Sequence, residues 1–196
     1  RERLVLPILL VITLYTLSQS LMQCTWALYT EFRYGWSPKM IGISIFVLGA
    51  AITITQGWIL PRLSAKLSPT HLVFAGLFCG FTALIGIGFS TAGTFLLPLL
   101  ALFSLMGVVG PTLQSVISRT GSPTTQGVRL GAASSLNSFT GAISPLLGTP
   151  LLFFTSQSAP TDLAAGTPYF LAALLVLAAI ILTILSPSQA DAENTH

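Results

Sequence analysis

The side chains of this sequence that could bind a small molecule inside a helix are mainly amides and hydroxyls. Gln19 and Gln23 lie about one helical turn apart in an apolar stretch near the N-terminus, and Trp26 continues the same face. Polar side chains are costly in membrane hydrocarbon unless they face other helices or water. This face therefore either offers amide hydrogen bonds to a substrate or packs against neighbouring helices, and both interpretations stay open.

The residue patterns of common enzymes and metal sites do not occur in the sequence. It contains no phosphate-binding Gly-rich loop with Lys, no nucleophile with a His and an acid, and no paired carboxylates. His71 has no second His, Cys or acid at ligand spacing. Cys24 and Cys79 lie in apolar stretches, where reduced, buried thiols are expected. We expect no enzyme activity, no cofactor and no metal.

The acidic residues are placed at predicted helix ends, in a loop or in the tail, at Glu2, Glu31, Asp162, Asp191 and Glu193. Proton coupling in a membrane needs a carboxylate or His that titrates near the middle of the bilayer. This chain alone therefore carries no proton relay, and in an antiporter the titrating group would lie in a partner half.

Composition places the chain among membrane proteins. Hydrophobic residues make up 53% and charged residues 7%, against about 25% charged in soluble domains. We expect an all-α, polytopic membrane protein in which residues 1–186 form one six-helix transmembrane domain and 187–196 a polar tail. The predicted transmembrane helices cover residues 4–30, 38–60, 70–90, 95–118, 126–154 and 169–185.

The basic residues predict the orientation in the membrane and exclude a nucleic-acid partner, because they are scattered between the helices. Six fall before the first helix and in the loops after the second and fourth: Arg1, Arg3, Arg62, Lys66, Arg119 and Arg129. Only Arg33 and Lys39 fall on the other side. Both termini are therefore expected in the cytoplasm.

Small residues predict which helix faces pack closely. From Met106 to Pro150, glycine, serine and proline recur at helical spacing, in the sets Gly127, Gly131, Ser135 and Asn137, Gly141, Pro145. Such faces let membrane helices approach each other closely, and the prolines loosen the backbone ladder where internal groups re-satisfy it. We expect this stretch to be a packed interior hairpin. By contrast, residues 169–185 are apolar all round and are predicted to form a peripheral, lipid-facing helix.

Six transmembrane helices of this kind resemble one half of a major facilitator superfamily transporter, whose halves are inverted three-helix repeats. Tyr29-Thr-Glu-Phe-Arg-Tyr-Gly-Trp-Ser37 with Met40-Ile-Gly42 resembles the link between helices seven and eight of tetracycline/proton antiporters. Gly110-Pro-Thr-Leu-Gln-Ser115 resembles their turn from helix ten to eleven, and Gly141-x-x-Ser-Pro145 a site in helix eleven. The resemblance covers residues 4–184. It implies the C-terminal half of a drug/proton antiporter in the bacterial inner membrane.

Gly57-x-x-x-Pro61-Arg62-Leu-Ser-Ala-Lys66 resembles the superfamily's cytoplasmic loop motif, which implies a gating role for Gly57, Arg62 and Lys66. Plain positive-inside anchoring by the two cations explains the same residues. Pro61 stands where the motif has an acid, and Gly80 where the tetracycline antiporters carry a carboxylate. The second departure removes a proton or cation site and makes tetracycline itself an uncertain substrate.

Two functions therefore remain open. The first is transport of a small molecule by alternating access, together with an N-terminal six-helix half in the same or a separate chain. Its candidate cavity residues are Gln19, Gln23, Trp26, Gln114, Asn137 and Ser138, and its candidate helix-bend residues are Gly107, Gly110, Pro111, Gly141 and Pro145. The second is a half-size accessory subunit that packs on other membrane subunits in the bilayer without transport activity.

Overall fold

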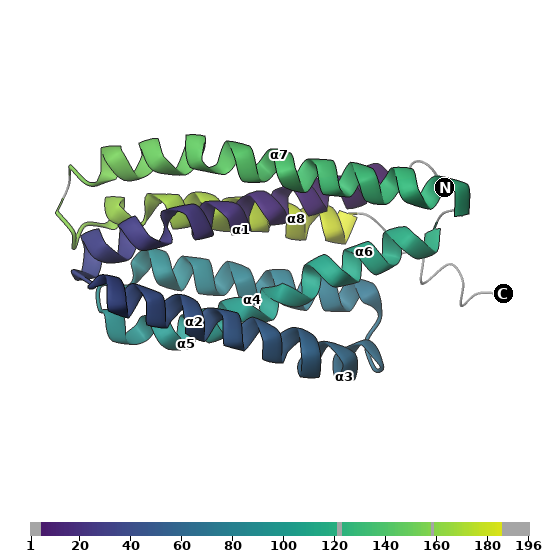
Figure 1. The fold of residues 1–196 in the computed structure, drawn as a ribbon, viewed down its shortest axis with the longest axis horizontal. Helices are drawn as coiled ribbons and strands as arrows, with labels where there is room; N and C mark the ends of the chain where they lie inside the picture. Colours follow the sequence, from purple (N-terminus) through teal and green to yellow (C-terminus); the bar gives the residue numbers. More distant parts are fainter. Residues whose placement is uncertain (1–4, 121–122, 158, 186–196) are drawn as a thin grey trace.

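The structure is a computed structural model that describes residues 5–120, 123–157 and 159–185. These residues form helices that run lengthwise beside one another and contain no strand (Figure 1). The helices are α1 (Val5–Tyr34), α2 (Pro38–Ile54), α3 (Leu60–Ser64), α4 (Pro69–Phe89), α5 (Leu96–Ser104), α6 (Val109–Thr120), α7 (Pro123–Thr155) and α8 (Thr167–Leu185).

Short irregular turns join several of these helices into longer rods. They are η2 (Thr55–Ile59), η3 (Gly93–Phe95), η4 (Leu105–Val108) and η5 (Leu163–Gly166). The described residues then contain six stretches long and apolar enough to cross a membrane: Leu6–Tyr34, Pro38–Ser64, Pro69–Phe89, Gly93–Ser118, Gln126–Thr155 and Leu163–Leu185. This confirms the predicted all-α, six-helix membrane architecture. The predicted tail at 187–196, Arg1 and Arg3 lie outside the described residues.

Three predicted helix boundaries are wrong by several residues. The first helix continues past residue 30 to Tyr34 and ends at Gly35, which takes the left-handed conformation (φ 63°) and donates its N–H to the Glu31 carbonyl. The second continues past residue 60 to Ser64, because the π turn η2 keeps the rod unbroken. The sixth begins before residue 169, at Leu163, through the 3-10 turn η5.

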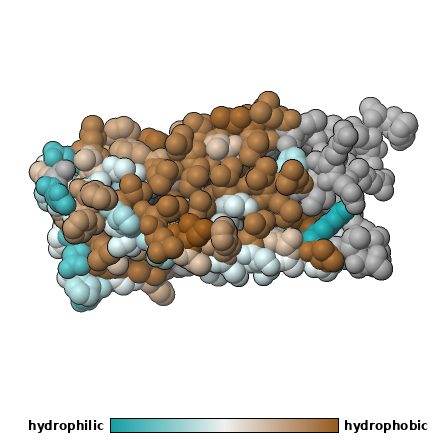
Figure 2. All heavy atoms as spheres, turned by 90° about the horizontal axis from the view of Figure 1, so that it is seen from above, coloured by the Kyte–Doolittle hydropathy of each residue, from teal (hydrophilic) through white to brown (hydrophobic). Residues whose placement is uncertain are grey.

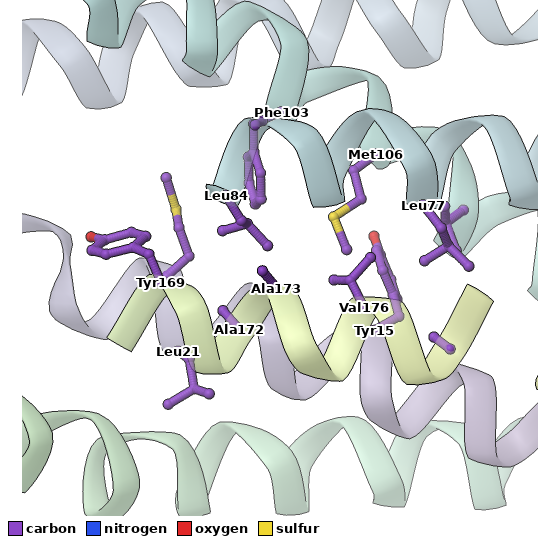
Figure 3. Packing of buried hydrophobic residues seen from close by; sticks show 14 of the residues in the cluster. Tyr15, Leu21, Leu77, Leu84, Phe103, Met106, Tyr169, Ala172, Ala173 and Val176 are labelled. Carbon is purple, nitrogen blue, oxygen red and sulfur yellow. The ribbon is translucent and has the colours of Figure 1, made fainter. Parts of the chain in front are cut away.

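The prediction that residues 169–185 form a peripheral, lipid-facing helix is right for one face of the helix only. α8 packs along α1 and α4, and Ala172, Ala173 and Val176 are buried. Figure 3 shows these side chains in one cluster with residues of α1 and α4. The small alanines let the backbones come close, and Ser18 of α1 donates a 2.9 Å hydrogen bond to the Ala172 carbonyl. The all-apolar α8 therefore buries one face against α1 and α4, while Leu174 (60% exposed) and Ile181 (48% exposed) remain uncovered on another face.

Glycines mark both the tight contacts and the uncovered faces. At Gly76 of α4 a Cβ would lie 2.8 Å from side-chain carbons of Val108 and Val109, so this glycine permits close packing. At Gly127, Gly131 and Gly141 of α7 a Cβ would meet nothing within 4 Å among the described residues. No other described helix covers this face of α7, so the close packing expected of the hairpin is not formed there within the described residues.

The described surface fits a membrane-spanning bundle. In Figure 2, seen from above, it is mostly hydrophobic, and hydrophilic residues gather at one end. That end carries the turns after α1, α4 and α7 (Figure 1).

Candidate functional site

The candidate cavity residues other than Trp26 lie on α1, α6 and α7. Gln23 is exposed and Gln19 is half-buried on α1, while Gln114 is exposed on α6. Asn137 and Ser138 are exposed on α7, which packs along α1. In the described part of the chain, no side-chain hydrogen bond is formed by Gln19, Gln23 or Gln114. Their amides are therefore available to a ligand or to a partner helix.

Trp26 does not line an open cavity, so its predicted place among these residues is wrong. It is 3% exposed, and its Nε1–H donates a 2.9 Å hydrogen bond to Ser44 Oγ of α2. Its ring lies edge-on to Trp36 and Tyr169, with centroids 6.4 Å away in both cases. Helical spacing places Trp26 on the glutamine face, but the chain turns back at Gly35 and α2 covers this part of that face.

Two prolines each leave a backbone carbonyl of this region without its helical N–H partner. Proline has no N–H, so Pro111 cannot bond the Gly107 carbonyl one turn earlier. Gly107 lies in the 3-10 turn η4, and Gln56 Nε2 donates to its carbonyl oxygen at 3.1 Å. Pro145 frees the Gly141 carbonyl in the same way, and the Ser144 hydroxyl donates to that oxygen at 3.3 Å. The freed carbonyls are re-satisfied internally, as membrane helices require.

Gln56 is a polar residue of this region that the sequence analysis missed. It lies in the π turn η2, and a further contact joins η2 to the end of α5, between the hydroxyls of Thr55 and Ser104 at 3.3 Å. Pro61 lacks the N–H that would bond the Gly57 carbonyl, and this favours the π turn before it. Single π turns are frequent at functional sites. Counting four residues back from Pro111 and Pro145 would have identified the free carbonyls of Gly107 and Gly141. It would not have identified Gln56 as the donor to the first of them.

Within the described chain, the cytoplasmic-loop residues Gly57, Arg62 and Lys66 form no ion pair or side-chain hydrogen bond to another transmembrane stretch. Arg62 is exposed, stacks on the Trp58 ring with its Cζ 4.0 Å from the centroid, and donates to the Trp58 carbonyl at 3.0 Å. Lys66 is exposed, and a Cβ at Gly57 would meet nothing within 4 Å. The described acids, Glu31 and Asp162, belong to the opposite end of the bundle (Figure 1).

Comparison with known proteins finds one recurring class. The class D tetracycline resistance protein of Salmonella ordonez is 33% identical over 169 residues, which cover 85% of this chain and 42% of that protein. The class B protein of Escherichia coli is 33% identical over 145 residues, which are 72% of this chain and 36% of that protein. This chain is a relative of the tetracycline resistance proteins. No family model matches it.

The predicted resemblance to this class is therefore confirmed. A third relative, the class G tetracycline resistance protein of Vibrio anguillarum, is 30% identical over 67% of this chain and 33% of its own length. The matches thus span between one third and about two fifths of the length of these relatives. The similarity and the six apolar stretches of the described residues together identify an integral membrane protein.

Proposed function

We propose that the chain is the C-terminal half of a drug transporter that works by alternating access around a cavity near the middle of the membrane. The observation that carries the proposal is the uncovered polar face of a chain related to tetracycline resistance proteins. Gln23 and Asn137 are exposed in segments apolar enough to lie in the bilayer. Amides in such positions belong against a wet cavity or other helices, because lipid cannot satisfy them.

The glycine faces indicate what completes the transporter. Adding a Cβ at Gly49 of α2, at Gly57 of η2, or at Gly131 or Gly141 of α7 meets nothing within 4 Å among the described residues. Small residues support close helix packing in membranes, so these faces suit docking against helices of a second half. The match to less than half of each relative's length leaves room for that half, in the same or a separate chain.

The basic residues support an orientation in the bacterial inner membrane in which both termini lie on the cytoplasmic side. Arg62, Lys66 and Arg129 belong to the end of the bundle where α3 ends and α7 begins, and Arg33 and Lys39 to the other (Figure 1). Basic residues favour the cytoplasmic side. The substrate class follows from the relatives' names: a tetracycline or another compact, polar drug that accepts amide hydrogen bonds.

The test is the substitution Gln23→Leu in the complete gene product, with drug accumulation measured in cells that express it. We expect higher accumulation, because the substitution removes an amide from the cavity, at an unchanged amount of protein in the membrane. Gln157→Leu is the matched control, because Gln157 is an exposed glutamine beyond the end of α7. Export by Gln23→Leu equal to that of the control would refute the cavity role.

An accessory subunit that packs on other membrane proteins would use the same glycine faces. The two proposals differ in transport by the complete gene product in isolation. Drug uptake by vesicles that contain only this gene product supports the transporter, whereas uptake that needs additional subunits supports the accessory role.

A further inference from the structure

Arg33 is a buried cation near the end of α1. Its side chain is 6% exposed, Nε donates to the Ser90 carbonyl at 2.8 Å, and Nη1 donates to the Asp162 carbonyl at 3.1 Å. The third nitrogen, Nη2, is buried without a hydrogen-bond partner among the described residues. The guanidinium carbon lies 5.7 Å from the centre of the Tyr29 ring. Arg33 thus ties α1 to the turns after α4 and α7 and retains unused donor capacity.

No carboxylate among the described residues neutralises this charge. Among the described residues Arg33 forms no ion pair, and the Asp162 carboxylate instead accepts the Ala159 N–H at 3.1 Å. Glu31 is exposed and lies two positions away on the same helix, where side chains do not face each other. A buried charge normally has an opposite charge or a complete set of hydrogen bonds. Arg33 therefore lacks an anionic partner among the described residues.

A groove of about 610 Å³ lies beside Arg33, between the start of α2 and the start of α5. Its wall includes Arg33, the hydroxyl side chains of Thr91 and Thr94, the Trp36 indole and Leu97, and no acidic residue. Gly93 makes room for the indole, because a Cβ there would lie 2.8 Å from Trp36 Nε1. The groove combines one cation with neutral hydrogen-bond donors, which is the chemistry that binds phosphate.

We propose that this groove binds the phosphate of a phospholipid headgroup. Its position supports a lipid source, because Tyr34 and Trp36 line it at the end of the transmembrane stretches, where aromatic residues meet headgroups. Phe95 of η3 (65% exposed) and Leu97 of α5 (38% exposed) offer an apolar surface to an acyl chain. The bound phosphate supplies the anion that Arg33 lacks and holds together the three segments that Arg33 joins. The proposal does not depend on transport activity.

The test is native mass spectrometry of the complete gene product, purified in detergent and titrated with phosphatidylglycerol. Thr91→Glu places a carboxylate in the groove and competes with the phosphate, whereas Thr91→Gln is the uncharged match at the same exposed position. We expect the wild type and Thr91→Gln to retain the lipid and Thr91→Glu to bind it about tenfold more weakly. Arg33→Gln should lose it as well. Diacylglycerol, which lacks the phosphate, should not be retained.

Three results would overturn the proposal. They are no retained lipid in the wild type, equal retention by the two Thr91 variants, and retention of diacylglycerol as strong as that of phosphatidylglycerol. Inorganic phosphate in the titration separates the two sources of the anion. Phosphate that displaces the lipid confirms that the headgroup phosphate is what the groove holds, whereas phosphate that binds to a protein that retains no phosphatidylglycerol shows that the groove takes a free anion only.

Discussion

The packing of α8 against α4 makes a quantitative prediction about two glycines. At Gly166, where η5 leads into α8, a Cβ would contact the Gly88 carbonyl oxygen of α4 and lie 2.9 Å from the Gly88 carbonyl carbon. The obstacle is backbone, so Gly166→Ala can be accommodated only if the two segments separate. At Gly141, in the middle of α7, a Cβ would meet nothing within 4 Å.

The two substitutions should therefore change stability in opposite directions. Overpacking of this kind costs about 1–3 kcal/mol. Gly141→Ala removes a flexible residue from a helix interior and gains about 0.5–1 kcal/mol. For a domain of this size about 1 kcal/mol corresponds to about 2–4 °C in Tm, so a 2 kcal/mol cost at Gly166 lowers Tm by about 4–8 °C.

The assay is thermal unfolding in detergent, followed by fluorescence-detected size exclusion, with wild type and both alanine variants side by side. A wild-type Tm for Gly166→Ala would show that η5, the turn that leads into α8, is not in backbone contact with α4. A fall in Tm for Gly141→Ala as large as that for Gly166→Ala would show that the Gly141 face is covered by another helix, either of this bundle or of a second half. If the face instead docks on a second half, Gly141→Leu should reduce transport by the complete gene product without unfolding this bundle.

Two further predictions concern single polar side chains. Gln56→Leu leaves the Gly107 carbonyl without its donor, so the free energy of unfolding should fall by about 1 kcal/mol. Thermal unfolding measures this loss, with Gln157→Leu as the control. An unchanged Tm for Gln56→Leu would contradict the hydrogen bond. Glu31→Gln should leave proton-driven drug uptake by vesicles unchanged, because Glu31 is exposed at one end of the bundle. Loss of proton coupling in this variant would show that this chain does carry the titrating group.

The helix count was predictable because apolar length alone determines it. The low charge content and the polar turns separate six stretches, and the described residues contain six. Helix position was not predictable in the same way. A hydrophobic side chain is equally suited to contact with lipid and to a packed interior. Apart from its alanines, the sequence of α8 therefore does not distinguish a lipid-facing surface from a buried one. Those alanines, at 172, 173 and 179, permit the close approach to α1 and α4.

The candidate site was predictable only in its exposed part. The glutamines of α1 share a face by periodicity, but that face extends beyond residue 26 under α2, and the spacing does not show where a later helix crosses it. For this reason Trp26 is a packing residue and Gln23 remains exposed. Gln56 was missed because it is a single amide among apolar and hydroxyl residues, and its own segment does not indicate which carbonyl of another helix it binds. The partner, Gly107, lies 51 residues further along the chain.

The most direct test of the central claim is drug uptake by energised inverted membrane vesicles that contain the complete gene product as their only added protein. Tetracycline and a panel of compact polar drugs serve as substrates, and the Gln23→Leu variant serves as the internal comparison. The account predicts uptake of at least one drug that collapses with the proton gradient and is reduced by Gln23→Leu. Correctly inserted protein with no gradient-dependent uptake of any drug in the panel would contradict it.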